Sequence, residues 1–259
     1  MLTVSGIQQI THFTFIVTFF GMIGGAIFFA MQSQRLKGEW QVAMTLEAVV
    51  CTIAALNYSA MKDIYTGLGN GIGIGVVAHH FPTEYRYIDW FLTVPLMLSQ
   101  FPALLGMGKR GLPFIYALIS LSLVMLVTGF FGEISADAGW HLGLLAIGTL
   151  AWFGIIGLLF YALSDLPDSI DEHKRGAVKR LALFVSIGWI IYPIGYLVSL
   201  ASLPGDYREL VYNIGDLVNK VGLGISVYVA GSLAQKASER KVGASALIDR
   251  EFDDEFVLA

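Results

Sequence analysis

The sequence predicts an all-α membrane protein built as a bundle of seven transmembrane helices. First, the 259 residues are 56% hydrophobic and only 14% charged, with a mean hydropathy of +0.68, which is too apolar for an ordinary soluble domain. Second, apolar runs of the roughly 20 residues that a helix needs to cross a bilayer recur seven times along the chain. Third, the basic residues cluster in alternate connections between these runs.

The apolar runs place the expected helices at residues 9–31, 41–63, 84–107, 111–131, 138–163, 177–201 and 207–235. No Lys or Arg precedes Arg35, so the first run lacks the basic region of a cleaved signal peptide and is expected to remain as a helix. Residues 1–235 are therefore expected to form one transmembrane domain. Residues 236–259 are polar and acidic, and we expect a loosely ordered cytoplasmic tail there.

Twelve of the 16 Lys and Arg residues lie in or beside the connections after the first, third and fifth runs, or in the tail. They are Arg35, Lys37, Lys109, Arg110, Lys174, Arg175, Lys179, Arg180, Lys236, Arg240, Lys241 and Arg250. Cytoplasmic loops carry the excess of basic residues. The pattern therefore predicts an extracellular N-terminus, a cytoplasmic C-terminus and a location in the cell (inner) membrane.

The connection before the third run contains five alternating glycines, followed by His79 and His80. Glycine-rich loops can cradle phosphate, but no Lys-Ser/Thr pair follows and no strand-to-helix unit surrounds this one. We expect an extracellular hairpin with solvated histidines. The single cysteine, Cys51, excludes an intrachain disulfide and argues against a cysteine-based metal site. We predict no metal site and no nucleic-acid partner.

Charged side chains lie inside two of the expected helices. A charge at membrane depth costs about 2.5 to 3.5 kcal/mol on insertion scales, so it needs a partner and a purpose. In the seventh run, Asp216 precedes Lys220 by four residues and shares its helix face. In the third run, Arg86 and Asp89 lie nearly one turn apart. Two further polar residues, Thr93 and Gln100, share that helix, with Gln100 about 16 Å of helix rise beyond Asp89.

These four deep charges sum to zero, because Lys220 and Arg86 are positive whereas Asp89 and Asp216 are negative. A neutral cluster can persist in a bundle of low dielectric, while any three of the charges would leave an unpaired ion. One interpretation is a static salt-bridge network that fixes helix packing. The other is a proton path, because both carboxylates would lie on the extracellular side of the amine if the helices are level.

Three motifs carry a resemblance to a known family. They are Arg86-Tyr-Ile-Asp-Trp-Phe-Leu-Thr-Val-Pro95, Trp189-Ile-Ile-Tyr192-Pro193 and Asp216-Leu-Val-Asn-Lys220, in the third, sixth and seventh runs. Over about residues 1–235 the chain resembles microbial rhodopsins, most closely the proteorhodopsin branch. The resemblance implies that the protein is no enzyme and that Lys220 holds all-trans retinal as a Schiff base. It also implies that Asp89 and Asp216 are the counterions, which fits the preference of a charged imine for nearby negative charge.

The resemblance further implies that six side chains wall the retinal slot. They are Trp90, Trp189, Tyr192 and Pro193, with Met97 and Tyr87 as further candidates. An apolar residue at position 97 suggests absorption of green light. In the implied cycle the imine proton passes to Asp89, Thr93 hydrogen-bonds Asp89, and Arg86 lies on the extracellular side. Glu209 is either an exit carboxylate or a solvated residue at a helix start.

Two positions, Gln100 and Asn57, depart from the usual pattern of the branch, and a third, Glu47, could replace the function that Gln100 lacks. Outward proton pumps usually carry a carboxylic acid at the position of Gln100, and an amide has no titratable proton to give. Reprotonation must then use water or another group such as Glu47, although we favour a Glu47 that reaches the interface or pairs with a loop cation. Asn57 matches the position where the branch often has a histidine that pairs with the counterion, and it is counted with the cofactor-binding residues.

The resulting functional hypothesis is a light-driven pump, with outward proton transport through Asp89 and slow reprotonation because of Gln100. The alternatives are a photosensory rhodopsin, which slow cycling would suit, or a pump of another ion or direction. Chloride is disfavoured because Asp89 would repel it at the imine. The expected partners are retinal, the lipid bilayer, the transported proton and further copies of the chain.

Overall fold

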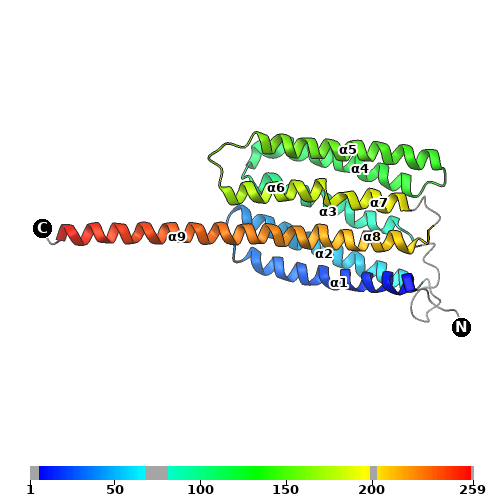
Figure 1. Ribbon diagram of the computed structural model, residues 1–259, viewed down its shortest axis with the longest axis horizontal. Coiled ribbons are helices and arrows are strands. Elements are labelled where there is room, and N and C mark those ends of the chain that lie inside the picture. The colour runs from blue at the N-terminus through cyan, green and yellow to red at the C-terminus, as the bar shows by residue number, and fades with distance from the viewer. Residues whose placement is uncertain (1–5, 68–80, 199–202, 258–259) are drawn as a thin grey trace.

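The computed structural model describes residues 6–67, 81–198 and 203–257, and its helices form the seven rods of an all-helical bundle (Figure 1). The first five rods are α1 (Gly6–Ser33), α2 (Glu39–Gly67), α3 (Glu84–Leu104), α4 (Leu112–Glu133, after the 3₁₀ turn η2 at Gly108–Gly111) and α5 (Ala138–Ser164). The sixth comprises α6 (Glu172–Ser186), η3 (Gly188–Ile190) and α7 (Ile191–Val198). The seventh comprises α8 (Asp206–Leu217), η4 (Val218–Gly222) and α9 (Leu223–Val257). The glycine-rich connection, with His79 and His80, lies outside the described residues.

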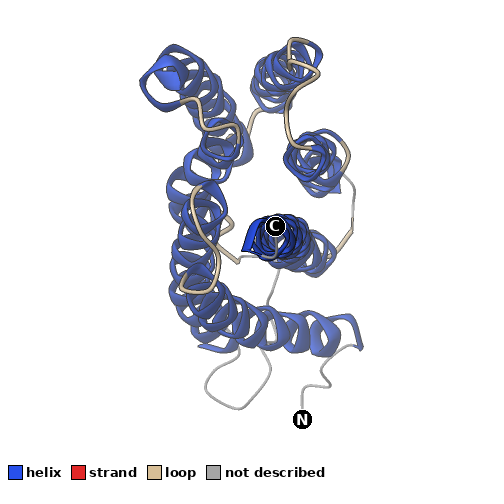
Figure 2. Cartoon of the chain, turned by 90° about the vertical axis from the view of Figure 1, so that its left-hand side faces the viewer, coloured by secondary structure: helices blue, strands red, loops and turns tan. Residues whose placement is uncertain are grey.

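The seventh rod closes the bundle. Consecutive rods pack against each other from α1 to α5, and α8 and α9 contact α1, α2, α6 and α7. Figure 2 shows the rods end on, with the rod that leads to the C-terminus lying among the others. We call the end where α1, α3 and α8 begin the N-terminal end, and the end from which α9 projects the C-terminal end (Figure 1).

The distribution of polarity is that of a membrane bundle. Large apolar side chains such as Phe13 and Leu150 are 64% and 68% exposed, whereas Arg86, Asp89 and Lys220 are at most 1% exposed. Within the described residues, six of the rods are long and apolar enough to cross a membrane. The exception is the third, α3, because its polar residues lower its hydropathy. A bilayer favours this arrangement, in which charged side chains face the interior of the bundle and apolar side chains face the lipid.

The sixth rod, expected as one helix over 177–201, is broken by η3. Pro193 has no backbone N–H, and its ring crowds the carbonyl four residues earlier, at Trp189. The break faces the seventh rod, where Asn219 Nδ2 donates to the Gly188 carbonyl at 3.0 Å. A Cβ atom on Gly188 would lie 2.1 Å from Asn219 Oδ1, so the contact requires glycine.

Two features of the seventh rod differ from the expectation. Lys220 lies in a π-helical segment, η4, a geometry that is rare and frequently found at functional sites. The helix does not end near residue 235 but continues to Val257, projecting from the bundle in Figure 1, so the expectation of a loosely ordered tail was wrong. The segment after 231 is rich in helix-forming residues, and the side chains of Gln235 and Glu239 form a hydrogen bond one turn apart.

Candidate functional site

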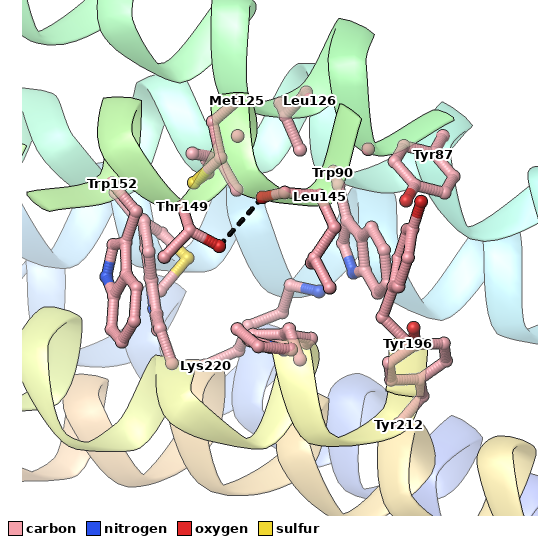
Figure 3. A pocket seen from close by; sticks show the side chains of 17 residues that line it. Tyr87, Trp90, Met125, Leu126, Leu145, Thr149, Trp152, Tyr196, Tyr212 and Lys220 are labelled. Atoms are coloured by element: carbon pink, nitrogen blue, oxygen red, sulfur yellow. Dashed lines mark hydrogen bonds between the residues drawn. The ribbon is translucent and has the colours of Figure 1, made fainter. Parts of the chain in front are cut away.

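A cavity lies inside the bundle, with Lys220 in its wall. Figure 3 shows the Lys220 side chain reaching into it, with Trp152 toward one side and Tyr87, Tyr196 and Tyr212 toward the other. Small-molecule sites have mostly apolar and aromatic walls with a few polar groups. This cavity therefore has the lining of a ligand site.

The six side chains expected to wall a retinal slot all line the cavity: Tyr87, Trp90, Met97, Trp189, Tyr192 and Pro193. Ten lining residues were missed: Val94, Met125, Leu126, Gly129, Leu145, Gly148, Thr149, Trp152, Tyr196 and Tyr212. Most of these are apolar or small residues within apolar helices, and nothing in the sequence marks them. Trp152 is the exception, since a tryptophan in an aliphatic run is conspicuous, and its Nε1 is held by the Val185 carbonyl at 2.8 Å.

The Lys220 amine lies between two carboxylates, as its sequence context predicted. Its Nζ is 2.5 Å from Asp89 Oδ2 and 3.0 Å from Asp216 Oδ1. All three side chains are almost fully buried, so the charges compensate one another away from bulk solvent. The amine thus faces the cavity with negative charge at its nitrogen.

The two carboxylates differ in their hydrogen bonds. Asp216 accepts from Tyr58 Oη at 2.7 Å, Tyr192 Oη at 2.9 Å and Trp90 Nε1 at 3.1 Å. Asp89 Oδ1, by contrast, has no hydrogen-bond partner among the described residues. Asp216 is therefore anchored on several sides, while one oxygen of Asp89 stays available.

Thr93 forms a hydrogen bond with Asp89, the contact that the resemblance implied. Its hydroxyl donates to the main-chain carbonyl of Asp89 at 3.0 Å, the back-bond that threonine commonly makes to the preceding turn of a helix.

A second ionic network occupies the N-terminal end. Arg86 lies 2.7 Å from Glu209 Oε2 and 3.8 Å from Asp216 Oδ2, and its guanidinium also donates to Tyr58 Oη and Asn213 Oδ1. Glu209 is fully buried, so the alternative of a solvated residue at a helix start was wrong. Arg86 connects Glu209 to the charges at Lys220.

The structure buries more charged side chains than the four that the sequence predicted. Arg208, which is 15% exposed at its side chain, lies 2.9 Å from Glu209 and 3.7 Å from Glu133. Glu133 is nearly buried and accepts from Tyr87 Oη at 3.0 Å and Tyr212 Oη at 3.2 Å, two residues of the cavity wall. The buried charges therefore extend from Lys220 to the N-terminal end, and the cluster does not close at four.

Toward the C-terminal end the polar residues form a pair. Gln100 Nε2 donates to Glu47 Oε2, and both side chains are fully buried. The favoured interpretation, in which Glu47 reaches the interface or pairs with a loop cation, was therefore wrong. Glu39, eight residues earlier on α2, pairs instead with a cation in the first turn of α6, because its Oε1 lies 3.1 Å from Lys174 Nζ.

Asn57 does not line the cavity, so its place among the cofactor-binding residues was wrong. Its Nδ2 donates to the Tyr85 carbonyl at 3.1 Å. Consecutive residues of a helix point in different directions, and the interior position on this turn of α2 belongs to Tyr58, which reaches Asp216.

The site suits a long apolar molecule bound through an imine. Aromatic and aliphatic walls would enclose a polyene such as retinal, and Lys220 supplies the nitrogen. The two carboxylates would neutralise the charge of a protonated imine. The free oxygen of Asp89 beside that nitrogen leaves a position where a proton can be received.

Comparison with known proteins agrees with this chemistry. A family model described as bacteriorhodopsin-like protein matches residues 9–232. The green-light absorbing proteorhodopsin of the gamma-proteobacterium EBAC31A08 is 29% identical over 212 residues, which cover 80% of each chain. The crystal structure of Exiguobacterium sibiricum rhodopsin is 36% identical with a TM-score of 0.74 and covers 88% of this chain and 98% of its own. A blue light-absorbing proteorhodopsin from Med12 is 26% identical with a TM-score of 0.73, covering 86% and 98%.

The family match spans most of the chain, and the similar proteins include proteorhodopsins. Proteins of this family are integral to the cell membrane and act as light-driven pumps or photoreceptors rather than enzymes. They hold retinal as a Schiff base on a lysine. The chain therefore belongs to the bacteriorhodopsin-like family of retinal-binding membrane proteins, in its proteorhodopsin branch.

Proposed function

We propose that the protein is a light-driven pump that moves protons out of the cell, with retinal on Lys220 and Asp89 as the first proton acceptor. Bound as an imine, retinal supplies light absorption and the isomerisation that frees the proton of the Lys220 nitrogen. Side chains of the protein itself receive, hold and pass on that proton.

The observation that carries this proposal is the unequal hydrogen bonding of the two carboxylates. Asp216 already accepts hydrogen bonds from Tyr58, Tyr192 and Trp90, which leaves it little capacity for a proton. Asp89 has one oxygen 2.5 Å from Lys220 Nζ and another without a partner among the described side chains. A proton that leaves Nζ therefore passes to Asp89, while Asp216 remains a fixed negative charge.

The outward direction follows from the order of groups along the bundle. Arg86 precedes Asp89 on α3 and contacts Glu209 near the start of α8, so this network lies between Asp89 and the N-terminal end. The clustering of basic residues assigns that end to the extracellular side. A proton on Asp89 then leaves past Arg86 and Glu209.

Refilling of the Lys220 nitrogen comes from the opposite side. Gln100 lies on the C-terminal side of Asp89, and its amide has no titratable proton to give. We expect the refilling step to be slow compared with a pump that has a carboxylic acid at this position. The same feature would suit a photosensory rhodopsin, which is the second candidate function.

Light-induced pH change in a suspension of expressing cells tests the proposal. Outward pumping acidifies the medium, and a protonophore abolishes the signal. Alkalinisation would mean inward transport, and no pH change would favour the sensor. The control is Lys220→Ala supplied with retinal, which should be colourless and give no signal. A coloured, photoactive Lys220→Ala protein would contradict the attachment site.

A further inference from the structure

We propose that Glu47 on α2 is the internal group that returns the proton to Lys220, with Gln100 as its positioning residue. This inference rests on the proposed outward pump. In this assignment a carboxyl group on α2 supplies the proton that the amide of Gln100 on α3 cannot give.

The first support is burial together with a dedicated partner. Glu47 and Gln100 are both fully buried, and the Gln100 amide donates to Glu47 Oε2. No salt bridge among the described residues involves Glu47. An ionised carboxylate in this setting would lack a contacting cation, whereas a protonated one meets an amide that can both donate and accept.

The second support is that the pair has unused hydrogen-bonding capacity. Glu47 Oε1 and Gln100 Oε1 have no hydrogen-bond partner in the described part of the chain. A protonated Glu47 can direct its O–H to the Gln100 carbonyl oxygen after a small rotation of either side chain. The amide thereby holds the proton in place without competing for it, because an amide does not titrate.

The third support is the position of Glu47 beside the Lys220 helix. A Cβ atom on Gly224 would lie 2.5 Å from Glu47 Cγ and 2.3 Å from Phe29 Cζ, so the absence of a side chain at Gly224 makes room for Glu47. Gly224 follows Lys220 by four residues, about one helical turn toward the C-terminal end. The carboxyl is thus packed one turn from the lysine, on the side opposite to the Arg86 network.

The proton transfer balances as follows. After the Lys220 nitrogen has given its proton to Asp89, the Glu47 O–H bond breaks and an N–H bond forms at Lys220, with water relaying the proton across the gap. Glu47 is left as a carboxylate, held by the Gln100 amide, until it takes a proton from the cytoplasm. Gln100 changes neither its charge nor its proton count.

Flash photolysis of the retinal-bound protein tests this assignment. Glu47→Gln should leave the transfer from Lys220 to Asp89 at its original rate and slow the recovery of the protonated nitrogen about tenfold or more. Azide, a small weak acid, should restore the recovery in the variant and change the wild-type protein little. The matched control is Glu39→Gln, which removes a partly exposed acid from the same helix and should not alter recovery.

A second variant guards against a folding defect. In the exchange variant Glu47→Gln with Gln100→Glu, the carboxyl moves from α2 to α3 and the pair is kept, so recovery should return toward the wild-type rate. Recovery in Glu47→Gln that matches wild type, with intact transfer to Asp89, would refute the role of Glu47 and leave the pump in place. An absence of transfer to Asp89 in the wild-type protein would instead refute the proposed function.

Discussion

Tyr58 Oη lies 2.7 Å from Asp216 Oδ2, and Arg86 donates to the same hydroxyl at 2.9 Å. Tyr58 thus joins the carboxylate at Lys220 to the ionic network of the N-terminal end. The bond also anchors Asp216 while Asp89 keeps a free oxygen. The two counterions are therefore unequal in their hydrogen bonding.

Tyr58→Phe removes a buried hydroxyl that both accepts and donates. Two buried polar groups lose a partner, and the expected loss of stability is about 1–3 kcal/mol. Thermal bleaching of the retinal-bound protein should occur at a lower temperature than in wild type. Tyr116→Phe is the control, because Tyr116 is 65% exposed on α4 and should leave the bleaching temperature unchanged. Equal bleaching of Tyr58→Phe and wild type would mean that the hydroxyl does not anchor Asp216.

Asp89→Asn should stop pumping and shift absorption to longer wavelength. The amide cannot receive the proton of Lys220 Nζ, and the loss of a negative charge 2.5 Å from that nitrogen reduces the stabilisation of the positive charge there. Acidifying the wild-type protein until Asp89 is protonated should produce a shift in the same direction, because protonation removes the same charge. The Asp89→Asn variant should lack this acid-induced shift. An acid shift that persists in the variant would assign it to another carboxylate.

The sequence predicted the centre of the site better than its surroundings. Lys220, Asp89 and Asp216 are conspicuous because a charge within an apolar run demands a partner. Both carboxylates lie within 3.0 Å of Lys220 Nζ. Glu209, Glu133 and Glu47 lie closer to helix ends, where the same residue type is usually solvated. Only packing against Arg86, Arg208 and Gln100 reveals that they are buried.

The helices, too, were predicted in their main course but not in their local irregularities. The apolar runs located all seven rods, but not the 3₁₀ turn at Gly188 or the π-helical segment around Lys220, which meet in the contact between Asn219 and Gly188. Such contacts join different rods and leave no periodic signal in the sequence. Green absorption from Met97, the orientation in the membrane and association into homo-oligomers stay predictions.

Glu209→Gln should delay the release of protons into the medium without affecting proton transfer from Lys220 to Asp89. The substitution removes the carboxylate that lies 2.7 Å from the buried Arg86. Breaking a buried ion pair typically costs roughly 3–5 kcal/mol, so the variant should also bleach at a lower temperature. Transfer from Lys220 to Asp89 should persist, while the appearance of protons in the medium, followed with a pH-indicator dye, should be delayed. Unaltered release kinetics would exclude Glu209 from the exit route.

Gly224→Ala should disturb Glu47 without touching its charge. The added methyl group would lie 2.5 Å from Glu47 Cγ and 2.3 Å from the Phe29 ring, closer than carbon atoms can approach, so one of them must move. We expect slower recovery after the flash and unchanged transfer to Asp89, because Asp89 lies on the other side of Lys220. Gly222→Ala is the control, since a Cβ there would meet the Phe184 ring at an ordinary 3.7 Å. If Gly224→Ala recovered at the wild-type rate while retaining its stability, close packing of Glu47 against α9 would not be required for reprotonation.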